Sequence, residues 1–195
     1  MGNKPVVLVV DNEPNNFALI EILLFREGYE FHYQESGKGA IAFLDNIQPD
    51  LILLDVIMPE TDGIEVCQQI KSNQRWQHIP IIIVTSLSEK EDLACCLDAG
   101  ADDFVGKPIN GNELRARMRS MLRIKAQYDH IQATMMSRQA IVQDLRDPLV
   151  ELSLECEALK SLGIPDHAQK SIDQISKSIA QMRLLVDDIS KQKQN

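Results

Sequence analysis

The chain has few cysteines, no long apolar segment and no excess of positive charge, and each absence argues against a class of protein. Its four cysteines have no metal-ligand spacing to histidine, and adjacent Cys95 and Cys96 do not suggest a disulfide framework. Reduced thiols in a cytoplasmic protein are therefore expected. No segment approaches the roughly 20 apolar residues of a membrane span, and no secretory signal is recognisable, so no membrane association is expected.

Positive charge is also scarce. The 195 residues include 20 Lys and Arg against 29 Asp and Glu, for a formal net charge of −9. Acidic residues outnumber basic ones both up to Lys125 and after it. This balance disfavours a nucleic-acid-binding output domain. The length suits one core of ordinary size plus a smaller module.

Four aliphatic segments predict strands that are buried on both faces, as in a parallel sheet. They are Val6–Val10, Leu51–Leu54, Ile81–Val84 and Phe104–Val105. Amphipathic segments over residues 15–26, 38–44, 64–72, 89–99 and from 110 onward predict the connecting helices. The alternation indicates an α/β fold of five βα repeats around a doubly wound, five-stranded parallel sheet.

The predicted strands are followed by residues with charged or polar side chains. Asp11, Asp55 and Thr85 follow the first three of these segments directly, and Lys107 follows the last one by two residues. Because the carboxyl ends of parallel strands meet at one edge of a sheet, these side chains are expected to share a pocket. A hard divalent cation suits such a cluster of oxygen ligands.

These segments resemble the response-regulator receiver domain of bacterial two-component signalling. The resemblance spans about residues 4 to 125 and rests on four motifs in order: Leu8–Pro14, Leu53–Pro59 with Asp62 and Gly63, Ile83–Ser86, and Ala99–Phe104 leading to Lys107 and Pro108. It implies a flavodoxin-like receiver domain in residues 1–125. It also implies a sensor histidine kinase or a phosphotransfer protein as partner.

The resemblance implies a role for each matching residue. Asp55 would accept the phosphoryl group, Lys107 and Thr85 would contact its oxygens, and Phe104 with Thr85 would form the conformational switch. The peptide bond from Lys107 to Pro108 is expected to be cis.

A Mg²⁺ ion is implied as the cofactor. Its expected ligands are Asp11, Asn12, Asp55 and the backbone carbonyl of Ile57. The family usually has a second acid where this chain has Asn12, so we expect weaker Mg²⁺ binding or help from Glu13. Asn12 is either a harmless variant, which we favour because the other pocket residues are present, or the mark of a receiver that phosphorylates poorly or signals without phosphate.

Beyond the receiver, apolar residues recur at steps of three and four from Met121 to Leu159 and again from Ala168 to Ile189. This pattern predicts that the last receiver helix continues into a helical hairpin, which forms a second domain over residues 126–195 with its turn near residues 161–166. One hairpin does not bury both apolar stripes, so a homodimeric four-helix bundle is expected.

The stretch that begins at Gln143 resembles the phosphoacceptor motif of histidine-kinase dimerisation domains. Gln143 stands where that family has its phosphorylated histidine, Asp147 stands where it has Thr or Asn, and Asp144 matches. Glutamine does not accept a phosphoryl group as imidazole does. We therefore expect a pseudo-phosphoacceptor face and no kinase activity, with His130 and His167 lying outside the motif.

Three functions follow from these features. The first is a phosphorylation-dependent response regulator that signals to a downstream protein through its helical domain. The second is a phosphorylation-independent scaffold or decoy for a kinase or another receiver, which Asn12 and Gln143 motivate. The third, an aspartyl phosphatase, is disfavoured because such enzymes usually carry a second acid at the position of Ile57. We expect no enzyme beyond slow loss of the chain's own phosphoryl group.

Overall fold

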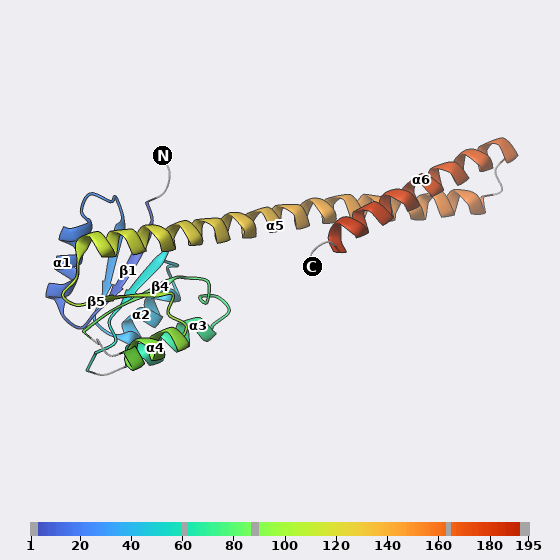
Figure 1. The fold of residues 1–195 in the computed structure, drawn as a ribbon. Helices are drawn as coiled ribbons and strands as arrows, with labels where there is room; N and C mark the ends of the chain where they lie inside the picture. The colour runs from blue at the N-terminus through green and yellow to red at the C-terminus, as the bar shows by residue number, and fades with distance from the viewer. Residues whose placement is uncertain (1–3, 60–61, 87–89, 163–164, 192–195) are drawn as a thin grey trace. The chain divides into compact units, whose positions relative to one another are not determined.

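The computed structural model describes residues 4–59, 62–86, 90–162 and 165–191 (Figure 1). Its single sheet has five parallel strands in the order β2-β1-β3-β4-β5. The strands are β1 (Val6–Val10), β2 (Glu30–Gln34), β3 (Leu51–Leu54), β4 (Ile81–Thr85) and β5 (Asp103–Gly106). The prediction of a doubly wound, five-stranded parallel sheet is confirmed.

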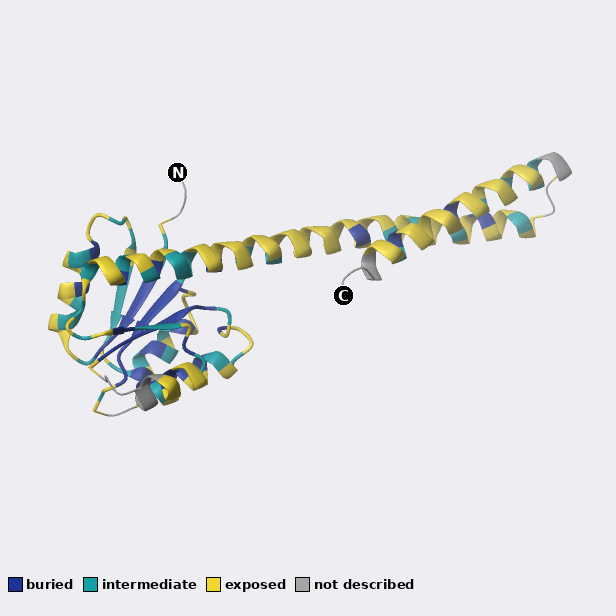
Figure 2. Ribbon diagram, in the orientation of Figure 1, coloured by how far each residue is buried: buried dark blue, intermediate teal, exposed yellow. Residues whose placement is uncertain are grey.

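The helices are α1 (Pro14–Leu24), α2 (Gly37–Leu44), α3 (Gly63–Ser72), α4 (Lys90–Asp98), α5 (Gly111–Ser161) and α6 (Asp166–Lys191). One face of the sheet packs against α2, α3 and α4, and the other packs against α1 and the first turns of α5. Figure 2 shows β1, β3 and β4 as the most deeply buried part of this domain. Burial on both faces explains the near-continuous aliphatic sequence of β1, β3 and β4.

Some predicted positions lie outside the described residues. These are Glu89 at the predicted start of the fourth helix, Gly163 and Ile164 in the predicted turn, and the side chain of His167. No helix in the described ranges is both long enough and apolar enough to cross a membrane.

The carboxyl ends of the strands are held in register by backbone hydrogen bonds that continue past the strands. The amide of Asp55 donates to the carbonyl of Val10 at 2.9 Å, and the amide of Lys107 donates to the carbonyl of Thr85 at 2.8 Å. The residues after β1 and β3 therefore lie side by side, as do those after β4 and β5. The Lys107–Pro108 peptide bond is cis, as expected.

The contacts divide the chain into two units, residues 1–129 and residues 130–195. In the second unit α5 packs antiparallel against α6. Polar contacts between the helices include Arg138 to the carbonyl of Ile189 at 3.0 Å, Arg146 to Asp187 at 2.5 Å, and Lys160 to Asp173 at 2.9 Å.

The predicted apolar stripes of α5 and α6, together called the seam below, are only partly covered within this hairpin. Val142, Cys156, Ile179 and Val186 are buried between the helices. Other seam positions are open: six of them, Leu145, Leu152, Leu159, Ile175, Met182 and Ile189, are each 43–52% exposed. The hairpin therefore keeps an unpartnered apolar face.

Gly63 allows the first turn of α3 to approach the segment after β3. Its amide donates to the carbonyl of Val56 at 2.9 Å, and Asp62 caps the helix by accepting from the amide of Ile64 at 2.8 Å. A Cβ atom on Gly63 would lie 2.1 Å from the carbonyl oxygen of Asp55, so no larger residue fits without a backbone shift.

We predict that Gly63→Ala lowers the free energy of unfolding by about 1–3 kcal/mol, because the added methyl group overpacks a backbone contact. Urea denaturation would measure the change. Gly106→Ala is the matched control, because a Cβ atom there meets nothing within 4 Å. Equal losses in the two variants would show that the close approach is not a constraint.

Candidate functional site

Lys107 binds two buried carboxylates at the carboxyl edge of the sheet. Its Nζ lies 2.9 Å from Oδ2 of Asp11 and 2.6 Å from Oδ2 of Asp55. Asp11 is 2% exposed and Asp55 is 5% exposed. Two residues that are 96 and 52 positions away from the lysine in sequence thus meet at one ammonium group.

The triad combines one cationic side chain with two acidic ones. Burial by itself lowers the pKa of Lys107, but the hydrogen bonds and negative charges of Asp55 and Asp11 outweigh burial, so the pKa is raised above its usual value. With the lysine protonated and both carboxylates ionised, the triad carries a net charge of −1. Buried charges of this kind are stable only when they are paired and hydrogen-bonded.

Two neighbouring groups also hold the carboxylate of Asp11, and a third holds its backbone carbonyl. Oδ1 accepts from the amide of Glu13 at 2.8 Å, and Nδ2 of Asn16 lies 3.0 Å from both Oδ1 and Oδ2. The hydroxyl of Tyr33 donates to the backbone carbonyl of Asp11 at 2.7 Å. Sequence analysis did not find Asn16 or Tyr33, because one lies in the first turn of α1 and the other on the edge strand β2, away from the strand ends that direct attention to the pocket.

Asp55 has fewer partners of its own. Oδ2 binds Lys107, and Oδ1 accepts only a long bond from the amide of Ile57, at 3.2 Å, among the contacts of the described residues. A carboxylate offers about four lone-pair positions, so Oδ1 keeps acceptor capacity. This oxygen is the better placed of the two to bind an incoming electrophile or cation.

Thr85 and Phe104 lie beside this pocket on β4 and β5. Thr85 is completely buried. Phe104 is half-buried against the core, and the guanidinium carbon of Arg117 lies 5.7 Å from its ring centroid. Arg117 also pairs with Asp103 at 2.5 Å, so α5 contacts both residues at the start of β5.

The oxygen donors at this edge fit a magnesium ion. They are the carboxylate of Asp55, the amide of half-buried Asn12, the backbone carbonyl of Ile57 and the carboxylate of Asp11. In the part of the chain that is described, no group of three or more His, Cys, Asp or Glu side chains is arranged to hold a metal, in line with an amide at position 12. The Asp11 carboxylate already accepts from three donor groups, so about one acceptor position remains for the ion or for its bound water.

The residues predicted for a pseudo-phosphoacceptor face lie in the second unit. Gln143, Asp144 and Asp147 are exposed, and Nε2 of Gln143 donates to Oδ1 of Asp147 at 2.6 Å. Asp144 lies at an apolar groove of about 310 Å³. The groove is also lined by Leu145, Pro148, Leu149, Met182, Leu185 and Val186.

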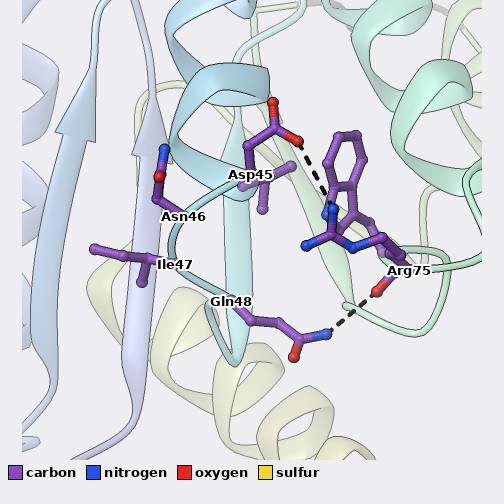
Figure 3. A pocket seen from close by; sticks show the side chains of 7 residues that line it. Asp45, Asn46, Ile47, Gln48 and Arg75 are labelled. Atoms are coloured by element: carbon purple, nitrogen blue, oxygen red, sulfur yellow. Dashed lines mark hydrogen bonds and ion pairs between the residues drawn. The ribbon is translucent and has the colours of Figure 1, made fainter.

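A larger hollow, of about 440 Å³, lies where α2 leads into β3. Figure 3 shows Asp45 turned towards Arg75, at 4.0 Å, and Gln48 donating to the backbone carbonyl of Arg75 at 3.2 Å. This hollow lies at the amino end of β3, opposite the end that carries Asp55. It contains none of the predicted site residues.

The sequence profile of the response regulator receiver domain family matches residues 7–119. Together with the fold and the acidic pocket, this match shows that the chain belongs to the response regulator receiver domain family. Its receiver region and the class of signalling protein expected from the four motifs are confirmed.

Individual relatives agree with this assignment. The chain is 40% identical over 125 residues to the response regulator PleD of Caulobacter vibrioides, which covers 64% of this chain and 28% of PleD. It is 36% identical over 119 residues to the DNA-binding dual master transcriptional regulator RpaA of Synechocystis sp., covering 61% of this chain and 49% of RpaA. The chain thus spans about half or less of the length of these curated relatives.

Solved structures show the same domain. The signal receiver domain of a signal transduction histidine kinase from Syntrophus aciditrophicus superposes with a TM-score of 0.57 at 34% identity. The superposition covers 61% of this chain and 90% of that domain.

We predict that Lys107→Met lowers the free energy of unfolding near neutral pH by about 3 kcal/mol, because it leaves two buried carboxylates without a cation. Since the pKa of Lys107 is raised in the folded state, its stabilisation is complete below the usual lysine pKa and declines as pH rises through the raised value. The advantage of the wild type should therefore be full at about pH 7–9 and shrink from about pH 10 upward.

Urea denaturation from pH 7 to pH 11 in metal-free buffer would measure this difference. Lys38→Met is the matched control, because Lys38 is exposed on α2 and should change stability by less than about 0.5 kcal/mol. A Lys107→Met protein as stable as the control would contradict the assignment of the triad.

Proposed function

We propose that this chain is a response regulator whose Asp55 accepts a phosphoryl group from a histidine kinase or a phosphotransfer protein in the cytoplasm. The observation that carries the proposal is the position of the Lys107 ammonium between two buried carboxylates at the end of β3. Phosphoryl transfer requires mainly in-line positioning and neutralised oxygens, and this arrangement supplies both a nucleophile and a cation.

The transfer step balances as follows. An oxygen of Asp55 attacks phosphorus and forms the O–P bond of an acyl phosphate, while the P–N bond to the donor imidazole breaks. The electron pair of that bond stays on the imidazole nitrogen, which takes up a proton from solvent. Lys107 contacts one phosphoryl oxygen and the hydroxyl of Thr85 contacts another, so the ammonium exchanges a carboxylate partner for the new group.

Magnesium, when bound, supplies positive charge that offsets the phosphoryl and carboxylate oxygens. Asp55, Asn12 and the carbonyl of Ile57 would hold it, with Asp11 beside them. Because Asn12 brings no charge, Asp11 and Asp55, which the triad brings together, would supply the negative charge beside the ion.

The switch that follows involves Thr85 and Phe104. When the Thr85 hydroxyl turns towards the phosphoryl group, the half-buried ring of Phe104 moves inward into the space that it leaves. This movement would loosen the contact between Phe104 and Arg117, which connects the strand edge to α5.

The output is proposed to be a protein contact made by the helical hairpin. Two chains would pair through the open seam positions and form a four-helix bundle that presents Gln143, Asp144 and Asp147 to a downstream protein. RpaA is described as DNA-binding, but the match to it covers 49% of its length. The acidic charge of this chain favours a protein partner over nucleic acid.

A phosphorylation-independent scaffold is the second candidate. The amide at Asn12 and the glutamine at Gln143 favour it, because both positions have lost the group that phosphate chemistry uses in the related families. In that case the hairpin would bind a kinase or another receiver whether or not Asp55 carries phosphate.

We predict that incubation with Mg²⁺ and a small phosphodonor such as acetyl phosphate labels Asp55, and that Asp55→Asn removes the label. Mass spectrometry of the intact protein and of its peptides would locate the modification. An unmodified Asp55, under conditions that label a control receiver, would favour the scaffold. So would an Asp55→Asn chain with unchanged cellular output.

We predict that the chain is a dimer and that Met182→Glu weakens it by about tenfold or more, because the new carboxylate would be buried without a partner. Met182 is 50% exposed in the single chain. Gln181→Glu is the matched control, since it adds the same charge at the adjacent exposed position. Light scattering over a concentration series would measure the molar mass, and a monomeric wild-type chain would contradict the bundle.

A further inference from the structure

Asp11 is fixed from outside the triad by side chains of α1 and β2. Nδ2 of Asn16 lies 3.0 Å from each carboxylate oxygen, so the amide contacts both sides of the same group. The hydroxyl of Tyr33 holds the backbone carbonyl of Asp11 at 2.7 Å. The ring of Tyr33 stacks on Phe17 with centroids 4.8 Å apart.

These contacts connect two elements through one residue. Asn16 and Phe17 are adjacent in α1, and Tyr33 is on β2, so Asp11 lies between a helix and an edge strand that are themselves in contact. With the Glu13 amide at 2.8 Å and the Lys107 ammonium at 2.9 Å, three donor groups hold a carboxylate that offers about four acceptor positions. Its orientation is therefore set before any ligand binds.

Asn12 makes this orientation important. With an amide at position 12, Asp11 and Asp55 are the two acidic side chains that the triad brings together. Partners that hydrogen-bond a carboxylate near a metal commonly set the affinity of the site. A fixed Asp11 faces the ion or its bound water without having to lose rotational freedom on binding.

We infer that Asn16, supported by Tyr33, is a positioning residue that orients Asp11 for Mg²⁺ and so offsets the missing charge at Asn12. This inference rests on the proposed phosphoacceptor function. It assigns to Asn16 a role in metal affinity that is separate from phosphoryl transfer at Asp55.

The test is Asn16→Leu, which keeps the approximate size of the side chain and removes the amide. Mg²⁺ would be titrated into the unphosphorylated full-length protein and followed by NMR at the backbone amides of Glu13 and Ile57, which donate to Asp11 and Asp55. The expected result is a loss of Mg²⁺ affinity of about tenfold. Tyr33→Phe, which keeps the stacked ring, should cause a smaller loss of the same sign.

Asn15→Leu is the matched control, because Asn15 is the adjacent exposed residue of α1 and should leave the affinity unchanged. Restoring the acid with Asn12→Asp should reduce the effect of Asn16→Leu to less than about threefold, since a second anion then binds the ion. Urea denaturation without metal would distinguish this role from a purely structural role of Asn16. In the structural case, Asn16→Leu lowers the free energy of unfolding and leaves Mg²⁺ affinity unchanged.

Each outcome decides the question. A tenfold loss that Asn12→Asp relieves supports the inference. Unchanged or tighter Mg²⁺ binding in Asn16→Leu overturns it and leaves the proposed function in place, provided that the wild type binds Mg²⁺ and is labelled at Asp55. A wild-type chain that neither binds Mg²⁺ nor is labelled overturns both.

Discussion

The pairing of Lys107 with Asp11 and Asp55 is the interaction on which the rest of the receiver depends. Two carboxylates that are almost completely buried would repel each other, and the ammonium group between them makes their proximity tolerable. The same arrangement is poised for change, because a phosphoryl group at Asp55 would present new anionic oxygens to the lysine. Under the proposed function, stability and signalling would share one cation, and each substitution at the triad is expected to alter both.

The chain geometry that produces the triad could largely be predicted. β1 and β3 are uninterrupted aliphatic segments because both faces of the sheet are covered, so their ends, and hence Asp11 and Asp55, were identified from sequence. β2 was not identified by residue: it is an edge strand whose residues are half-buried or exposed, and Glu30, His32 and Gln34 break its apolar pattern. Asn16 and Tyr33 were missed for a related reason. Their contacts with Asp11 depend on how α1 packs beside β2, which no local pattern encodes.

In the helical unit the sequence pattern is clear, but the contacts that would bury its apolar residues are incomplete. Its heptad spacing is clear in the sequence, and the antiparallel contacts of Arg138, Arg146 and Lys160 agree with two helices that pack along one seam. The seam is nevertheless only half covered within one chain, since Leu145 and Met182 remain 50% exposed. Sequence periodicity shows which residues need an apolar contact to be buried. It does not show which molecule provides that contact. The pseudo-phosphoacceptor interpretation of Gln143 also stays a prediction, because the family match ends at residue 119.

In the proposed mechanism the ammonium of Lys107 passes from a carboxylate to the phosphoryl group when Asp55 is modified. A crystal structure of the protein with Mg²⁺ and beryllofluoride, which imitates an acyl phosphate, would show whether it does. We expect beryllium bonded to a carboxylate oxygen of Asp55, with Nζ of Lys107 within about 3 Å of a fluoride. A structure in which Asp55 is unmodified and still paired with Lys107, under conditions that modify another receiver, would contradict it.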